Sequence, residues 1–187
     1  TVIAPGSRRC VVLAGKGSNG GDGLVAARHL ASRGWRTVVL LLAREDEVTG
    51  EARRNLSMAR EAGVEIVAVN SMALAGSMGR LGEAGVIVDA IFGTGFRGSP
   101  MGLAAQLIEA ANSAAAPVVA VDVPSGVEAD TGAVRGIAIT ATATVTMGLP
   151  KIGLLLYPGA AHAGTLYVAD IGYPPALLHT LKLATAV

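Results

Sequence analysis

The chain of 187 residues has little cysteine and little aromatic character: it contains one cysteine, and aromatic residues make up 3% of it. A lone cysteine cannot form a disulfide within the chain, so we expect Cys10 to be a small core residue in a reducing cytoplasm. The few stacking rings and the formal net charge of +1 argue against a nucleic-acid platform. Apolar runs such as Val38–Ala43 are too short to span a bilayer, and no signal-peptide pattern opens the chain, so we expect a soluble protein without membrane association.

Charged residues are also few, at 16%, against 51% hydrophobic residues. This apolar excess is typical of parallel strands that helices cover on both faces. Strand-like and helix-like segments alternate, which predicts one α/β domain over residues 1–187, a three-layer αβα Rossmann-like fold with a mostly parallel central sheet. The predicted strands are Arg9–Ala14, Thr37–Leu42, Val64–Val69, Val86–Ala90, Val118–Asp122, Ala143–Met147 and Thr165–Ala169.

The segments between the predicted strands carry apolar residues at helical spacing, so each should place one face against the sheet. Ser99 followed by Pro100 predicts the start of a helix, with serine as N-cap and proline in the first turn. A short C-terminal helix is predicted near Pro175–Lys182. The Gly- and Ala-rich segment 73–85 has no definite assignment.

A glycine-rich loop, GKGSNGGDG at residues 15–23, leads from the first predicted strand directly into helix-patterned sequence. Glycines remove Cβ atoms that would hold a ligand away, and they leave amide N–H groups at a helix N-terminus, where the macrodipole favours an anion. The loop therefore predicts a phosphate cradle, with Gly21 where the backbone approaches the ligand. Asn19 and Asp22 add an amide and a carboxylate that a hydride-transfer fingerprint does not need, so the loop should do more than hold phosphate.

Two further polar clusters follow predicted strand ends: Asp89 with residues 91–98, and Asp122 with Ser125. Ligands of open α/β sheets bind at the carboxyl ends of the strands, near the point where the strand order reverses. If the first strand lies beside the fourth, and the fourth beside the fifth, all three clusters meet in one crevice. Each aspartate could equally cap a loop, but a carboxylate buried at the edge of an apolar sheet needs a cation, a donor or a ligand to compensate it.

The remaining titratable residues give weaker signals. His29, His162 and His179 have no metal-ligand spacing, so they are expected to be surface or core residues. Lys16 is not part of a G-x-x-x-x-G-K-[ST] phosphate loop. Lys151 is interpreted either as a solvated charge or as a phosphate contact.

Taken in order, five motifs resemble the NAD(P)H-hydrate epimerase family, also called the YjeF N-terminal domain: GKGSNGGDG, VDAIFGTGFRG, DVPSG, LPK and VADIG. That family interconverts the R and S forms of hydrated NADH and NADPH, so that an ADP- or ATP-dependent NAD(P)H-hydrate dehydratase that acts on one epimer can restore the cofactor. The resemblance implies an isomerase of this activity, a homodimer with one potassium ion per subunit, and the dehydratase as functional partner, separate or fused.

The resemblance also implies site residues. Asn19, Asp89 and Ser125 are the implied potassium ligands, a weakly charged oxygen set that suits a large monovalent cation. Asp122 is the predicted acid/base group, because the sheet holds its backbone rigidly at a strand end, and Asp22 and Lys151 are the next candidates. The implied substrate contacts are Ser18, Asn19, Gly20, Gly21, Asp22, Gly93, Thr94, Gly95, Phe96, Arg97, Gly98 and Asp122.

Two features depart from the family pattern. Ser18 stands where the family usually has asparagine, which predicts altered substrate contacts without loss of the ion, since Asn19 is in place. Only about nine residues precede Cys10, so the helical segment that the family has there is expected to be missing.

Two other functions stay open. An NADP-dependent oxidoreductase fits the G-x-G-x-x-G spacing and Arg44 at the end of the second predicted strand, where a basic residue could meet a 2′-phosphate. It leaves Asp89 and Asp122 unexplained. A non-catalytic binding module of the same fold, with a protein or RNA partner, could lose its acid/base residue, whereas Asp89, Asp122 and Ser125 are all present here.

Overall fold

The computed structural model describes residues 7–174 and 176, which build a seven-stranded sheet with helices on both faces. All neighbouring strands are parallel, in the order β3-β2-β1-β4-β5-β6-β7. The strands are β1 (Arg9–Ala14), β2 (Arg36–Leu41), β3 (Glu65–Ala68), β4 (Val86–Ala90), β5 (Val118–Val121), β6 (Ala143–Met147) and β7 (Thr165–Ala169). The helices are α1 (Ser18–Ala31), α2 (Gly50–Glu61), α3 (Leu74–Gly82), α4 (Gly102–Ser113) and α5 (Ala160–Ala163), with 3₁₀ turns η1 (Glu45–Glu47) and η2 (Ile152–Leu154).

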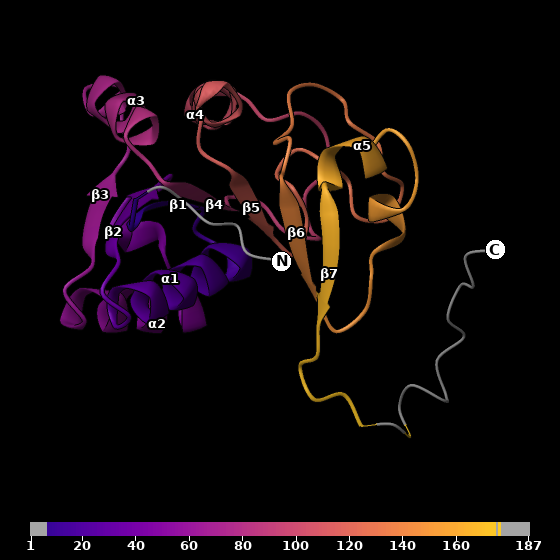
Figure 1. Ribbon diagram of the computed structural model, residues 1–187, viewed down its shortest axis with the longest axis horizontal. Coiled ribbons are helices and arrows are strands. Elements are labelled where there is room, and N and C mark those ends of the chain that lie inside the picture. Colours follow the sequence, from indigo (N-terminus) through magenta and orange to yellow (C-terminus); the bar gives the residue numbers. More distant parts are fainter. Residues whose placement is uncertain (1–6, 175, 177–187) are drawn as a thin grey trace.

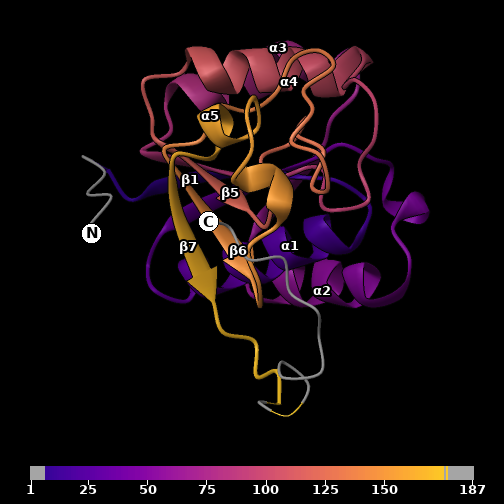
Figure 2. The ribbon, with the colours of Figure 1, turned by 90° about the vertical axis from the view of Figure 1, so that its right-hand side faces the viewer.

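The helices form two layers, with α3 and α4 on one face of the sheet and α1 and α2 on the other (Figures 1 and 2). Side chains of a strand alternate between the faces, so β1 supplies both cores. Val11 and Leu13 pack with Leu107 under α3 and α4, whereas Val12 packs with Leu24 against α1 and α2. This arrangement confirms the predicted three-layer α/β fold.

The strand order reverses at β1, which pairs with β2 on one side and with β4 on the other. β5 follows β4, and the register places Leu13, Asp89 and Ala120 side by side on the three strands. The carboxyl ends of β1, β4 and β5 are therefore adjacent. The convergence of the three polar clusters is confirmed.

One predicted helix start is wrong. The helix α4 begins at Gly102 with Met101 as its N-cap, and not at Ser99 and Pro100. The Ser99 side chain packs instead against the Gly136 backbone, where a Cβ would lie 2.1 Å from the serine hydroxyl. Ser99 thus contacts a second loop instead of capping the helix. The Ser-Pro pattern alone does not predict this contact.

Smaller differences concern single elements. Segment 73–85, which had no assignment, holds α3, and His162 lies in α5, where its Nδ1 is 3.0 Å from the carbonyl of Ile139. The helix predicted near Pro175–Lys182, and with it His179, falls outside the described residues apart from Ala176, which is helical. None of the helices described here is long and apolar enough to cross a membrane.

The predicted core position of Cys10 is confirmed. Its side chain is buried in the layer beneath α1 and α2, and burial raises the pKa of its thiol to about 12. A thiol that stays protonated is a poor nucleophile, so Cys10 acts as a packing residue.

Candidate active site

A cavity of about 1020 Å³ lies along the carboxyl ends of β2, β1, β4 and β5. This volume reaches the upper end of the range usual for ligand pockets, roughly 300–1,000 Å³. Its walls come from the glycine-rich loop, the segment after β2, the segment after β4, the start of α4, and Asp122 after β5. The cavity therefore has the size and the place in the sheet that a dinucleotide requires.

The glycine-rich loop turns sharply between β1 and α1. The Gly15 amide donates to the carbonyl of Ala90 at 3.1 Å, and a Cβ at Gly15 would lie 2.1 Å from the carbonyl oxygen of Ile91. The helix α1 begins at Ser18 with Gly17 as an N-cap that makes no side-chain hydrogen bond. Its first amides are thus left for a ligand at the positive end of the helix.

Three glycines predicted to contact substrate do not line the cavity: Gly20, Gly21 and Gly98. A Cβ at Gly21 would lie 3.2 Å from the Cα of Ala52, so this residue is a glycine because α1 packs closely on α2. Gly21 thus faces α2, whereas the sequence predicted that its backbone approaches the ligand. Gly20 faces the Gly15 carbonyl, and the Gly98 amide donates to Glu128 at 3.2 Å. The other predicted contacts, Ser18, Asn19, Asp22, Gly93, Thr94, Gly95, Phe96, Arg97 and Asp122, all line the cavity.

Asp89 is the last residue but one of β4 and is completely buried. One carboxylate oxygen accepts the Ser125 hydroxyl at 2.6 Å, and the other accepts the Ser125 amide at 2.7 Å. In the described part of the chain no basic side chain forms an ion pair with Asp89. Burial raises the pKa of this carboxyl to about 6, against the opposing effect of the Ser125 hydrogen bonds. A buried carboxylate without a counter-charge is what a bound cation would compensate.

The three implied potassium ligands come together around the backbone of Phe92. The Asn19 side-chain amide donates to the Phe92 carbonyl at 2.8 Å, and the Phe92 amide donates to the Ser125 hydroxyl at 2.9 Å. Gly93 lets this segment pass close to Asn19, since a Cβ there would lie 3.0 Å from the Asn19 Cβ. An amide, a carboxylate and a hydroxyl are hard oxygen donors with a single negative charge, which fits a monovalent cation.

Asp122 lies just beyond β5 in a tight turn. Its φ of 66° makes it the only non-glycine residue with positive φ in the described chain. The Val123 amide donates to the Val121 carbonyl at 2.8 Å, which closes a three-residue γ-turn around Asp122. Such a turn is rare and strained, and strained backbone is often found at functional sites. β5 ends one residue earlier than predicted because the turn begins at Val121, although the Asp122 amide still donates to the Val145 carbonyl of β6 at 2.8 Å.

The Asp122 side chain is held from one side only. Its Oδ1 accepts the Thr146 hydroxyl at 3.2 Å and the Met147 amide at 3.1 Å, and it pairs with the Lys151 ammonium. Lys151 also donates to the Met147 carbonyl at 2.9 Å, and both side chains of the pair are largely buried. Lys151 is therefore neither a solvated charge nor a phosphate contact here, but the partner of Asp122.

Asp22 faces the same end of the cavity from the first turns of α1. Burial raises the pKa of its carboxyl, and the negative charge of Asp122 raises it further. Asp122 has a cationic partner and Asp22 has none in the described ion pairs, so the two carboxyl groups have different environments. Paired carboxyl groups of unequal environment are typical of acid/base sites.

The segment after β4 is held in place by its own contacts. The rings of Phe92 and Phe96 stack with centroids 4.6 Å apart. Arg97 donates to the carbonyls of Thr94 and Phe96 at 2.8 and 2.7 Å, and it pairs with Asp130. The Arg97 guanidinium is thus already engaged in shaping the wall of the cavity.

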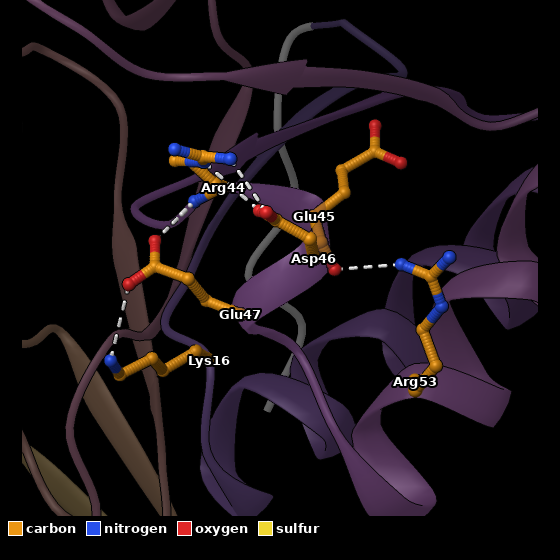
Figure 3. Close-up of polar contacts among 6 residues, drawn as sticks. All are labelled: Lys16, Arg44, Glu45, Asp46, Glu47 and Arg53. Carbon is orange, nitrogen blue, oxygen red and sulfur yellow. Dashed lines mark hydrogen bonds and ion pairs between the residues drawn. The ribbon is translucent and has the colours of Figure 1, made fainter.

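A charged rim closes the cavity beyond β2 (Figure 3). Glu47 accepts the Arg44 amide at 2.8 Å on one oxygen and lies 3.4 Å from the Lys16 ammonium on the other. The Arg44 guanidinium makes two bonds to Asp46, at 3.0 and 2.6 Å. The sequence drew attention to Arg44, but Glu47 was missed because nothing local joins it to Lys16, 31 residues earlier.

With this geometry, the similarity to known proteins becomes informative. The profile of the family described as YjeF-related protein N-terminus matches residues 2–153. The bifunctional NAD(P)H-hydrate repair enzyme Nnr of Moorella thermoacetica is 49% identical over 93% of this chain, and the match covers 33% of that enzyme. The NAD(P)H-hydrate epimerase of Levilactobacillus brevis is 43% identical over 88% of this chain and 73% of that protein.

A solved structure agrees with these relatives. The crystal structure of yeast ynu0, YNL200c, superposes with a TM-score of 0.76 at 29% identity, over 98% of this chain and 74% of that one. The chain spans about a third of the length of the bifunctional relatives, because it covers 33% of the enzymes from Moorella thermoacetica and Thermofilum pendens.

Proposed function

The chain belongs to the family described as YjeF-related protein N-terminus, and from this premise we propose that it epimerises the R and S forms of hydrated NADH and NADPH. One observation carries the proposal: a dinucleotide-sized cavity is lined by two carboxyl groups, Asp122 on a strained turn with its lysine partner, and Asp22, which is near enough for the charge of Asp122 to raise its pKa. Relatives named NAD(P)H-hydrate epimerase and NAD(P)H-hydrate repair enzyme support the choice of substrate.

The reaction requires only proton transfer and charge stabilisation. Hydrated NAD(P)H carries a hydroxyl on the ring carbon next to the ring nitrogen. A proton delivered to this hydroxyl lets the nitrogen lone pair expel water and leaves an iminium cation. Water that returns to either face of the carbon, with loss of a proton to the protein, gives the R or the S hydrate. Nothing is oxidised or reduced, so one acid/base group and a nearby negative charge suffice.

The two aspartates can divide these tasks. Asp122 Oδ1 is taken by Thr146, Met147 and Lys151, while Oδ2 accepts none of these bonds and is left for proton exchange with substrate. Asp22, which also lines the cavity, supplies negative charge beside the iminium cation or a second proton-transfer group. We assign the acid/base role to Asp122, because its rigid turn fixes the carboxyl group in space.

A potassium ion belongs to the proposal. Asn19, Asp89 and Ser125 would hold it, and when bound it supplies a fixed positive charge beneath the cavity. The buried Asp89 carboxylate, which has no cationic partner among the described residues, supports this assignment. The ion would also fix the Phe92 segment, since Asn19 and Ser125 both bond to that backbone.

We further propose that the product is consumed by a dehydratase specific for one hydrate epimer and dependent on ADP or ATP. Relatives three times as long as this chain carry the name bifunctional, which supports a dehydratase fused in some of them. A homodimer is the proposed assembly, and gel filtration with light scattering would measure it.

The proposal is tested with purified (R)-hydrate of NADPH. We expect the protein to convert it to a mixture with the (S)-hydrate on chiral chromatography, while the total amount of hydrate stays constant. Absorbance of NADPH should not change, whereas an oxidoreductase would alter it in the presence of its substrate. Recovery of unchanged (R)-hydrate, with and without potassium chloride, would overturn the proposal.

A further inference from the structure

We propose that Arg44, assisted by Lys16, binds the 2′-phosphate of the adenosine ribose, so that the cavity prefers hydrated NADPH to hydrated NADH. The inference rests on the proposed function, because it takes the ligand to be a hydrated nicotinamide dinucleotide. The basis is the charged rim of Lys16, Arg44 and Glu47, which lines the end of the cavity farthest along the sheet from β5.

The shape of the cavity determines which part of the dinucleotide lies beside the rim. The reacting ring must lie at Asp122, beyond β5, so the rest of the dinucleotide extends along the strand ends. Toward β2 it passes the uncapped start of α1, where amide N–H groups suit the pyrophosphate, and it then reaches Arg44. In doubly wound sheets the residues after the second strand meet the adenosine ribose, and an arginine there accommodates a 2′-phosphate.

In the other direction the described residues place one cationic side chain in the cavity wall, Arg97, and its guanidinium donates to the carbonyls of Thr94 and Phe96 and pairs with Asp130. The cavity extends toward the start of α4 past Phe92, Met101 and Leu103, which are apolar. A flat base or ring can pack there, whereas a dianion would gain a charged partner only if Arg97 gave up two backbone carbonyls as well as Asp130. The distribution of charge in the cavity therefore directs the phosphates to the β2 end.

Charge balance at the rim favours an anion. The cluster around η1 contains four cations, Lys16, Arg44, Arg53 and Arg60, and three carboxylates, Glu45, Asp46 and Glu47, so it carries one net positive charge. A ribose 2′-hydroxyl would need a free carboxylate oxygen after β2. Both oxygens of Glu47 are engaged, one by the Arg44 amide and one by Lys16 (Figure 3).

Arg44 can exchange its present partner for a phosphate. Its pair with Asp46 is largely exposed, and exposed ion pairs add little to stability. A phosphate offers more acceptor oxygens and about twice the charge of a carboxylate, and the arginine fork binds it through two parallel bonds. Glu47 keeps the Arg44 backbone and the Lys16 ammonium in place while the guanidinium turns.

The direct test compares two nucleotides that differ only in the 2′-phosphate, adenosine 2′,5′-bisphosphate and 5′-AMP, by isothermal titration calorimetry. We expect the wild-type protein to bind the bisphosphate roughly 10- to 100-fold more tightly, the scale of one charged bidentate contact. Arg44→Ala should remove most of this ratio, and Lys16→Ala part of it. Arg54→Ala is the matched control, since Arg54 is an exposed arginine that pairs with Glu51 and does not line the cavity.

Equal affinity of the wild-type protein for both nucleotides would overturn the inference, and so would an Arg44→Ala variant that keeps the wild-type ratio. The second measurement is the ratio of kcat/KM for the hydrates of NADPH and NADH, which Arg44→Ala should lower by the same factor and Arg54→Ala should leave unchanged. A wild-type protein that discriminates the two nucleotides but epimerises neither hydrate would refute the proposed function and support the phosphate site. Epimerisation of both hydrates with equal kcat/KM would refute the phosphate site alone.

Discussion

Asp122 is held in an unfavourable backbone conformation while three donors fix one oxygen of its side chain. A residue with φ of 66° costs on the order of 1 kcal/mol, and aspartate and asparagine tolerate this region better than most residues. Asp122→Asn therefore keeps the turn and removes the titrating proton. We expect the epimerisation rate to fall by about 10²- to 10⁴-fold, the usual range for an acid/base group.

The measurement is the conversion of (R)-hydrate by the Asp122→Asn variant, followed by chiral chromatography. Its control is the affinity for 5′-AMP, which should change little because the adenosine end lies far along the cavity. If the variant converts the (R)-hydrate near the wild-type rate, Asp122 is not the acid/base group, and Asp22 is the next candidate.

The pKa of Asp22 should depend on the charge of Asp122. The pKa of the Asp22 carboxyl is raised first by burial and then by the charge of Asp122, so Asp122→Asn should lower it. Carboxyl ¹³C shifts of the Asp22 side chain, followed through a pH titration of both proteins by NMR, measure the change. An Asp22 pKa that is equal in the two proteins would mean that the carboxyl groups do not interact.

The sequence drew Asn19, Asp89, Ser125 and Asp122 together because each lies at or just after the carboxyl end of a predicted strand, and the family resemblance then implied their roles. The sequence did not identify the role of Lys151, whose partner lies 29 residues away. The contact between Lys151 and Asp122 depends on β6 lying beside β5. This pairing places Thr146 and Met147, and Lys151 shortly after them, next to Asp122. No local pattern encodes this distance.

At the scale of elements, the glycine-rich loop and α1 carry glycines for two different reasons. Those before Ser18 make the turn and the cavity wall, whereas Gly21 brings α1 close to α2. A valine at Gly21 would press its methyl groups into Ala52, so Gly21→Val should lower the free energy of unfolding by about 1–3 kcal/mol, the usual effect of overpacking. Urea denaturation measures this loss.

The matched control for this change is Gly79→Val in α3. Gly79 is exposed, and no atom lies within 4 Å of the position that its Cβ would take. Glycine and valine differ little in helix propensity, so the control should stay within roughly 0.5 kcal/mol of wild type. Equal stability of the Gly21→Val protein would refute close packing of α1 on α2.

The strands could be predicted closely because they are short, apolar and separated by turn residues, and β1, β4, β6 and β7 have the predicted bounds. The start of α4 could not, because Ser99 contacts a loop 37 residues away instead of capping the helix. Helix ends depend on such contacts more than strand interiors do. This explains why the predicted start of α4 was wrong, while the prediction that one face of this segment packs against the sheet is confirmed by the buried Leu107.

At the scale of the whole molecule, the sheet order makes one cavity out of three separate sequence clusters. The order reverses at β1, so the loop after β1 and the segments after β4 and β5 share one edge. The sequence predicted this convergence on the condition that the first strand lies beside the fourth and the fourth beside the fifth, which is the observed order. It could not predict the extension of the cavity to the charged rim after β2, because that requires the position of η1 relative to Lys16.

Potassium binding should be visible in the stability of the whole protein and in its pH dependence. Without an ion, burial raises the pKa of Asp89 from 3.8 to about 6. Between pH 3.8 and 6 the folded protein therefore carries a proton on Asp89 that the unfolded chain has already lost. The stability from this protonated carboxyl is full below pH 3.8 and is lost as the pH rises through 6, a loss on the order of 3 kcal/mol.

A cation held by Asn19, Asp89 and Ser125 would restore stability at neutral pH, because it binds the folded protein only. At pH 7.5 we therefore expect a higher unfolding midpoint in potassium chloride than in choline chloride, and a smaller difference at pH 5, where protons compete with the ion. Asp89→Asn should abolish the effect of potassium and flatten the pH dependence between pH 4 and 7. The control is Asp22→Asn, which leaves the buried Asp89 carboxylate in place and should retain the effect of potassium. Equal midpoints for the wild-type protein in both salts, together with no anomalous peak near Asp89 in a rubidium-soaked crystal, would refute the potassium site while leaving the acid/base assignment of Asp122 to its own test.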